Sequence, residues 1–225
     1  MIEIGNNSSV YKTIWNNQMV AFKIIKDDKN GICKEAVCEM SILNQLKHPY
    51  FIQLYDVIFE KRKTILILEL ADMDLSYYIK DGENDVNLMF QLCEAVAYCH
   101  EHHIIHGDIK PENILIKNQQ IKLADFGLSQ KIIINTPKSL VASLWYRAPE
   151  LLCSKNYSYP VDVWSIGCVW SEYLTGQVLF KGNINNQLQL YNHIPSLQLS
   201  ETLWLTDFLS MDPLKRIKLN KIISN

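Results

Sequence analysis

The hydrophobic pattern of the chain changes near residue 72, and no other feature constrains the fold as strongly. Before this point, short β-branched and apolar runs bounded by polar turns predict strands at residues 19–25 and 64–70. After it, apolar residues recur mainly at helical spacing. We therefore predict an α+β fold with a small strand-rich lobe over residues 1–70, a larger helical lobe over 71–225 and a cleft between them.

Three helices are indicated by apolar residues that recur every three or four positions. The first stops before Pro49, and its apolar residues are Ala36, Met40, Leu43 and Leu46. The inward face of the second is predicted from Val86, Phe90, Cys93 and Ala97. The third begins near Pro160 and ends at Gly176, and because it is apolar on most sides we expect it to lie buried within the helical lobe.

The composition is that of an ordinary globular protein, with 48% hydrophobic and 20% charged residues. A net charge of −2 gives no support for bulk attraction to nucleic acid or to an anionic membrane. The first residues do not form a secretory leader, and the most apolar run, 65–70, is too short to span a bilayer. The six cysteines include no CxxC pair, so we expect reduced core thiols and an intracellular protein of the cytoplasm or nucleus.

A polar segment at residues 106–113 contains the groups needed to handle a phosphate. The carboxylate of Asp108 is followed two residues later by the ammonium of Lys110 and five residues later by the amide of Asn113. Such a loop can accept a proton, steady a phosphate and bind a metal ion. Standing alone, the same segment would be interpreted as a polar surface loop.

A second acidic position lies twelve residues beyond Asn113, at Asp125 in the sequence Asp125-Phe126-Gly127. Apolar runs at 114–116 and 121–124 bracket a turn, which would bring Asn113 and Asp125 to neighbouring strand ends. One carboxylate and one amide oxygen, completed by phosphate and water, form a donor set that Mg²⁺ accepts. We therefore predict that these two residues hold Mg²⁺.

Lys23 lies in the middle of the predicted strand at 19–25, where an unpaired ammonium would be costly. Glu39 shares a helix face with Leu43 and can supply the partner. A lone lysine in a strand is usually an edge or solvent residue. A carboxylate partner and a phosphate to hold favour a functional interpretation, so we predict a Lys23–Glu39 ion pair in the cleft.

Taken together, these residues resemble the motif set of eukaryotic-type protein kinases in order and spacing, over nearly the whole chain. The resemblance implies one kinase domain spanning 1–225, with ATP as substrate and Mg²⁺ as cofactor. It implies that Asp108 is the proton acceptor, with Lys110 beside it. It also implies that Lys23, paired with Glu39, holds the α- and β-phosphates, and that Asp125 and Asn113 are the metal ligands.

The same resemblance implies a nucleotide site and two structural contacts. Leu68 falls at the gatekeeper position, and residues 69–71 form a hinge whose backbone would bind adenine. The residues expected at the nucleotide are Ile4, Gly5, Val10, Ala21, Lys23, Glu69, Ala71 and Leu115. Glu150 is expected to pair with Arg216, and Asp162 to cap the backbone of the catalytic loop.

Within the family, Lys110-Pro111-Glu112-Asn113 is the form similar to serine/threonine kinases. Ser143 then resembles the residue that bonds Asp108 and Lys110. The segments 143–150 and 161–168 look most like the cyclin-dependent and MAP kinase (CMGC) group. That likeness implies protein substrates with serine or threonine acceptors, often followed by proline.

Two regions depart from the family pattern. In the phosphate-covering loop, our preferred alignment puts Glu3, Gly5 and Ser8 at the three glycine positions; the alternative aligns Ile4-Gly5 with the first glycine and requires a deletion. Gly107, Cys38 and Gln130 stand where arginines commonly grip an activation-loop phosphate. Lys138 stands at the usual phosphorylated position, flanked by Thr136 and Ser139, so we predict a loop ordered without phosphate.

Three further expectations concern partners and alternatives. The helix carrying Glu39 lacks a cyclin-binding sequence, so a cyclin-type partner is not supported. A catalytically weak pseudokinase or scaffold module is the alternative function, motivated by Glu3 and Ser8. It is disfavoured because Lys23, Asp108, Asn113 and Asp125 are all present. A small-molecule phosphotransferase is disfavoured because residues 143–150 resemble a peptide-binding segment.

Overall fold

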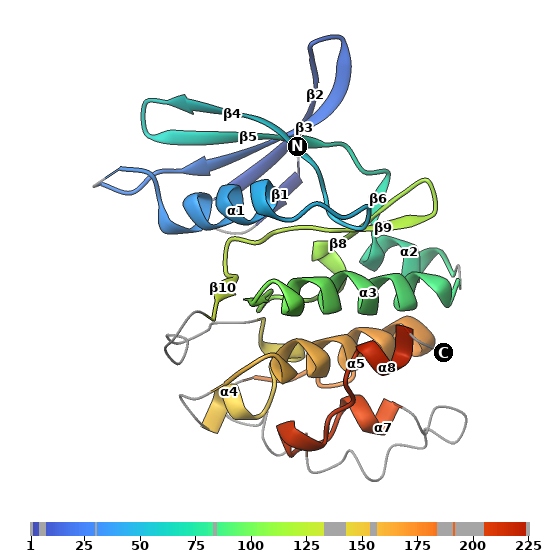
Figure 1. Ribbon diagram of the computed structural model, residues 1–225. Helices are drawn as coiled ribbons and strands as arrows, with labels where there is room; N and C mark the ends of the chain where they lie inside the picture. Colours follow the sequence, from blue (N-terminus) through green and yellow to red (C-terminus); the bar gives the residue numbers. More distant parts are fainter. Residues whose placement is uncertain are drawn as a thin grey trace.

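The computed structural model shows strands in the first part of the chain and helices in the rest (Figure 1). It describes residues 8–29, 31–82, 85–132, 143–153, 157–183, 191 and 205–223, together with the backbone of 2–4. The predicted α+β arrangement of two lobes is confirmed.

The N-terminal lobe is an antiparallel sheet in the order β1-β2-β3-β5-β4. Its strands are β1 (Ile2–Ile4), β2 (Ser8–Trp15), β3 (Gln18–Lys26), β4 (Leu54–Glu60) and β5 (Lys63–Glu69). Two of the turns are tight because their residues adopt the left-handed conformation, with φ of 48° at Asn16, 63° at Asn17 and 65° at Arg62. The predicted strands at 19–25 and 64–70 therefore lie side by side as β3 and β5.

Helix α1 (Lys34–Gln45) lies beneath this sheet and presents the predicted apolar face to it (Figure 1). Ala36, Ile42 and Leu43 on that face are buried, and Leu46 at the helix end is buried as well. Because Glu39 lies on the same buried face, its carboxylate has to find a cation inside the lobe.

The second lobe begins with a short strand and a capped helix. Strand β6 (Met73–Asp74) leads into α2 (Leu75–Asp81), where the Asp74 side chain accepts a 2.9 Å bond from the Tyr77 amide and Gly82 ends the helix at φ 79°. Strands β8 (Ile114–Lys117) and β9 (Gln120–Leu123) form a hairpin that pairs with β6. This hairpin forms the floor of the cleft below the hinge.

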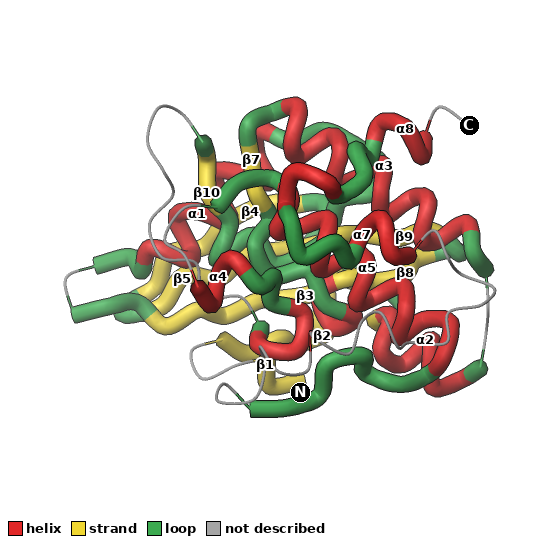
Figure 2. Tube along the Cα trace, turned by 90° about the horizontal axis from the view of Figure 1, so that it is seen from below, coloured by secondary structure: helices red, strands yellow, loops and turns green. Residues whose placement is uncertain are grey.

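Two long helices make the core of the second lobe, α3 (Asn87–Glu101) and α5 (Pro160–Thr175). Seen from below, they lie in front of the strands (Figure 2). The predicted bounds of α5 are confirmed, since Gly176 ends it in the left-handed conformation at φ 70°. Short elements complete the lobe: β7 (Ile104–Ile105), η1 (Pro111–Asn113), β10 (Gln130–Lys131), η2 (Leu144–Tyr146), α4 (Glu150–Cys153), α7 (Leu205–Phe208), η4 (Pro213–Lys215) and α8 (Asn220–Ile223).

The structure corrects two sequence-based expectations. Val86 precedes α3 and is 48% exposed, and Phe90 is 43% exposed, whereas Cys93 and Ala97 are buried as predicted. The predicted inward face of this helix was misplaced because α3 is covered on more than one side, by β9 and by α5. Its apolar residues therefore do not define a single face. All six cysteines are free thiols, but Cys153 on α4 is exposed rather than part of the core.

The predicted Glu150–Arg216 ion pair is present and ties the start of α4 to the segment after η4. The guanidinium makes two parallel bonds of 2.6 and 2.7 Å to the carboxylate and donates to the carbonyl oxygens of Pro160 and Ser210. It also lies 5.0 Å from the ring centre of the fully buried Trp164. Such a fork geometry is available to arginine and not to lysine.

A close approach between α5 and the segment 205–209 predicts the effect of Gly167→Ala on stability. A Cβ at residue 167 would lie 2.8 Å from Phe208 Cβ and 2.9 Å from Leu209 Cδ2. Alanine would contribute about 1 kcal/mol of helix propensity, but overpacking costs about 1–3 kcal/mol, so we expect net destabilisation. Urea unfolding measures it, with Leu174→Ala on the exposed side of α5 as the control. A variant more stable than the parent would contradict the close packing.

Candidate active site

The segment 106–113, which carries Asp108, is held by one buried carboxylate, that of Asp162 in α5. Its two oxygens accept bonds of 2.9 Å from the backbone amides of His106 and Gly107. Burial alone would raise the pKa of Asp162, but His100, His106 and the hydrogen bond from the Gly107 amide hold it below its ordinary range. The predicted cap is therefore present, and it keeps its negative charge.

Asp108 is fixed by four donors from three residues. Its Oδ2 accepts from Lys110 Nζ at 2.8 Å and from Asn113 Nδ2 at 3.0 Å. Its Oδ1 accepts from the Ser143 amide at 2.9 Å and from the Ser143 hydroxyl at 2.7 Å. Lys110 also donates to the Ser143 hydroxyl at 3.0 Å. The predicted link between Ser143, Asp108 and Lys110 is thus present.

Lys23 joins both lobes through two carboxylates. Its ammonium lies 2.7 Å from Glu39 Oε2 and 2.8 Å from Asp125 Oδ1, and the ion pair predicted with Glu39 is present. Burial alone would lower the pKa of Lys23, but the two carboxylates raise it above its ordinary value. The lysine is therefore a fixed positive charge that faces the cleft.

The backbone at Asp125 is set by the packing of the residue after it. Asp125 has φ 62°, a left-handed conformation that aspartate tolerates better than most residues. The ring of Phe126 is fully buried between His106, at 4.8 Å between ring centres, and Phe51, at 5.7 Å. This packing turns the Asp125 carboxylate toward Lys23.

The donor set fits the predicted Mg²⁺. Asn113 and Asp125 both line the same cavity, and the Ala124 amide donates to the Asn113 carbonyl at 2.9 Å, so the two strand ends are neighbours. The Asn113 side chain donates through Nδ2 to Asp108, which leaves its oxygen as the ligand atom. In the described part of the chain, no cluster of three or more His, Cys, Asp or Glu side chains could hold a metal by itself. A sparse site of this kind relies on substrate phosphates, as Mg²⁺ sites commonly do.

A cavity of about 200 Å³ lies between the lobes, where the nucleotide was predicted. Of the predicted residues, it is lined by Val10, Ala21, Lys23, Glu69, Ala71 and Leu115, and also by Leu68. The side chain of Ile4 and the whole of Gly5 lie outside the described residues, so the alignment of the phosphate-covering loop stays a prediction. The lining is mostly apolar and includes the charged groups of Lys23 and Asp125, which suits a flat base and a phosphate chain.

A family model for the protein kinase domain matches residues 2–224. The chain belongs to the protein kinase family. The family assignment agrees with the fold and with the placement of Lys23, Asn113 and Asp125 around one cavity. Among the described helices of this kinase, none combines the length and the apolar composition needed to cross a bilayer.

The kinase departs from its family where arginines would face the activation segment. Gly107 has φ 80°, a conformation that glycine adopts without strain. Cys38 on α1 instead bonds through its thiol to the Ser129 carbonyl at 3.0 Å, and Lys131 bonds Gln45 on the same helix at 2.5 Å. Helix α1 is therefore attached directly to residues 129–131, which follow Asp125-Phe126-Gly127. Thr136, Lys138 and Ser139 lie outside the described residues.

Sequence reasoning missed the role of His100. Its Nε2 lies 2.9 Å from Asp162 Oδ2, and its side chain is only 15% exposed. The contact joins α3 to α5 across 62 positions of the chain, so no local motif marks it. The one signal in the sequence that could have indicated this contact is the position of His100 shortly before the segment 106–113.

The buried Asp162 predicts a pH-dependent loss of stability. Because its folded-state pKa is depressed, its contribution is fully present above the ordinary aspartate pKa of about 3.9 and is lost as pH falls through the folded value. We expect Asp162→Asn to cost about 1.5–3 kcal/mol near neutral pH, since hydrogen bonds to a charged group are lost. Urea unfolding between pH 7 and pH 3 should show the gap between parent and variant closing at the acid end.

The control for this series is Asp207→Asn at an exposed position, which should change stability little at any pH. A gap between parent and Asp162→Asn that stays constant down to pH 3 would contradict an ionised cap.

Proposed function

We propose that this chain is an ATP-dependent protein serine/threonine kinase that uses Mg²⁺ and transfers the γ-phosphoryl group to hydroxyls of protein substrates. The observation that carries the proposal is the arrangement around Asp108, whose carboxylate accepts hydrogen bonds from Lys110 and Ser143. A lysine two residues after the proton acceptor, bonded to a hydroxyl of the peptide-binding segment, is the form similar to serine/threonine kinases.

The proposed reaction is an in-line displacement. The acceptor hydroxyl oxygen attacks the γ-phosphorus, its proton passes to Asp108, and ADP leaves with the electrons of the broken P–O bond. Lys110 faces the oxygen of Asp108 that Ser143 does not contact, and its charge can stabilise the transferred group. Lys23 would hold the α- and β-phosphates through a cation that Glu39 keeps in place.

Mg²⁺, held by Asp125 and Asn113, would supply charge neutralisation of the phosphates. Asp125 is also paired with Lys23 at 2.8 Å. The proposal therefore requires Asp125 to face both the lysine and the metal, which a two-oxygen carboxylate can do.

The finer substrate preference follows from the segment that precedes α5. Trp145-Tyr146-Arg147 and the following Ala148-Pro149-Glu150 look like the cyclin-dependent and MAP kinase group, so we propose acceptors followed by proline. Protein substrates are the only partners in the proposal. It includes no nucleic acid, no membrane and no cyclin-type subunit, and it places the protein in the cytoplasm or nucleus.

A pseudokinase or scaffold is the second candidate, favoured by Glu3 and Ser8 at glycine positions of the phosphate-covering loop. A carboxylate beside the phosphates would weaken ATP binding by like-charge repulsion. Binding of Mg·ATP does not separate the two candidates, because both allow it. Transfer of phosphate to a generic acceptor protein separates them, since only the enzyme performs it.

Replacing either the proton acceptor or the metal ligand should strongly reduce phosphate transfer without unfolding the protein. We expect Asp108→Asn to reduce turnover by about 10²–10⁴-fold, because the base and its orientation are lost. Asp125→Asn should cause a comparable loss, since a neutral oxygen replaces a charged magnesium ligand. The measurement is steady-state phosphate transfer to a generic acceptor, with Asp56→Asn at an exposed position of β4 as the control. Turnover within tenfold of the parent would sink the assignment.

Activation-segment phosphorylation should be dispensable. A phosphate carries about −1.5 to −2 charges and stabilises a loop where cations await it, but Gly107, Cys38 and Gln130 supply none. Thr136→Ala and Ser139→Ala, separately and together, should keep full turnover, as should the phosphatase-treated parent. If dephosphorylation removes activity and rephosphorylation at either residue restores it, the loop is held by phosphate after all.

A further inference from the structure

Glu69, the last residue of β5, has its carboxylate bound on three sides by the protein. Its Oε1 lies 2.9 Å from Lys117 Nζ, and its Oε2 lies 3.6 Å from Lys122 Nζ. The Gln53 amide donates to Oε2 at 3.3 Å, while the Glu69 amide donates to the Gln53 carbonyl at 2.8 Å. This residue begins the hinge, so its side chain is well placed to fix the hinge backbone.

The two lysines belong to a single element of the other lobe. Lys117 ends β8 and Lys122 lies in β9, so Glu69 connects the N-terminal sheet to the β8–β9 hairpin. Lys122 also donates to the Pro49 carbonyl at 2.6 Å, which brings in the segment after α1. Three stretches of chain thus meet at one carboxylate.

This ion cluster is sheltered from water. The side chains of Glu69, Lys122 and Lys117 are 10%, 15% and 27% exposed. The hydrogen bond that Lys117 donates to the Glu69 carboxylate raises the pKa of Lys117 above its ordinary value. Partial burial makes such a pair stronger and less sensitive to salt than one on the open surface.

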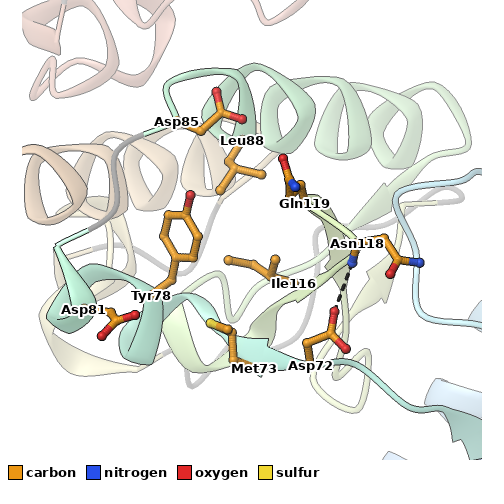
Figure 3. A pocket seen from close by; sticks show the side chains of 9 residues that line it. All are labelled: Asp72, Met73, Tyr78, Asp81, Asp85, Leu88, Ile116, Asn118 and Gln119. Carbon is orange, nitrogen blue, oxygen red and sulfur yellow. Dashed lines mark hydrogen bonds between the residues drawn. The ribbon is translucent and has the colours of Figure 1, made fainter.

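The hinge is attached to the same hairpin a second time, three residues later. The Asp72 amide donates to the Ile116 carbonyl at 2.9 Å, and the Asp72 carboxylate accepts from the Asn118 amide at 3.0 Å. Figure 3 shows this second bond at the edge of a cavity of about 640 Å³ on the hinge side of the hairpin. Residues 69–72 are therefore held to the hairpin at both ends.

The hairpin also carries the floor of the nucleotide cavity. Leu115 of β8 lines that cavity together with the hinge residues Leu70 and Ala71. Leu115 is paired across the hairpin with Lys122, one of the two lysines bonded to Glu69. The ion cluster therefore links the hinge to the strand pair that carries the Leu115 floor.

We propose that Glu69 is a positioning residue, whose side chain clamps the hinge to the β8–β9 hairpin and so fixes the width of the adenine slot. The consequence for ATP rests on the proposed function, while the clamp itself is a property of the nucleotide-free protein. Glu69 contributes its backbone to the slot and its carboxylate to the clamp, and only the carboxylate is changed by substitution.

The test compares Glu69→Gln and Lys117→Met with the double variant. Glu69→Gln should raise the dissociation constant and the KM for Mg·ATP by about three- to tenfold, the effect of weakening a partly buried ion pair. The maximal turnover and the KM for peptide should stay within twofold of the parent. The double variant should be no worse than Glu69→Gln alone, because both changes remove the same interaction.

A matched control is Glu60→Gln at the β4–β5 turn. It removes the exposed ion pair between Glu60 and Lys63, whose charged atoms lie 2.8 Å apart, and should change neither nucleotide affinity nor hinge exchange. Hydrogen exchange of the nucleotide-free protein gives the independent measure. Amides of residues 69–72 should exchange faster in Glu69→Gln, while those of α5 stay unchanged.

Unchanged exchange at the hinge would overturn the clamp, whatever the nucleotide data show. A fall in turnover and peptide affinity together with faster exchange throughout the protein would also overturn it, by showing a general structural role. Failure of the parent to bind Mg·ATP would count against the proposed function, while faster hinge exchange would still support the clamp.

Discussion

The site depends on the ion pairs that the Lys23 ammonium makes with Glu39 and Asp125. The ammonium lies within 2.8 Å of carboxylates from α1 and from the segment after β9, so one cation fixes elements of both lobes. The buried charges of Lys23 and Glu39 would each be costly alone, and removing Lys23 would leave two neighbouring carboxylates without a cation. The three groups therefore adopt one arrangement together, with Lys23 facing the cleft and Asp125 beside the predicted metal position.

A second buried charge supports the opposite side of the cleft. Asp162 holds the backbone of the catalytic loop through two amides, and the loop in turn carries Asp108. The helix beneath is almost wholly buried, so the support is rigid. A carboxylate positioned by a rigid helix and bonded by Lys110 and Ser143 is oriented before any substrate arrives, which is the kind of preorganisation that phosphoryl transfer requires.

Much of this could be predicted from sequence because the informative residues are close together along the chain. The spacing of Asp108, Lys110 and Asn113 and the turn before Asp125 are local, and the helical face that carries Glu39 is local too. The family resemblance supplied the long-range pairs, such as Glu150 with Arg216. The strand and helix positions followed from hydrophobic periodicity, because an element that buries only one face keeps its apolar residues at regular spacing.

The contacts that were missed join distant residues and carry no motif. His100 reaches Asp162 across 62 positions, Glu69 reaches Lys117 across 48, and Cys38 reaches Ser129 across 91. The inward face of α3 was misplaced because neighbours on several sides bury it, so exposed Phe90 and buried Cys93 look alike in the pattern. Charge partners of this kind become visible only when the fold brings the elements together.

The most direct test of the account is whether the purified chain transfers phosphate, and to which hydroxyl. It would be incubated with Mg·ATP labelled at the γ-phosphate and a degenerate peptide library containing serine, threonine and tyrosine acceptors. Labelled phosphoamino acids would then be separated, and a reaction without Mg²⁺ would serve as the blank. The account predicts Mg²⁺-dependent phosphoserine and phosphothreonine. Binding of Mg·ATP with no transfer above the blank, or label found only in phosphotyrosine, would contradict it.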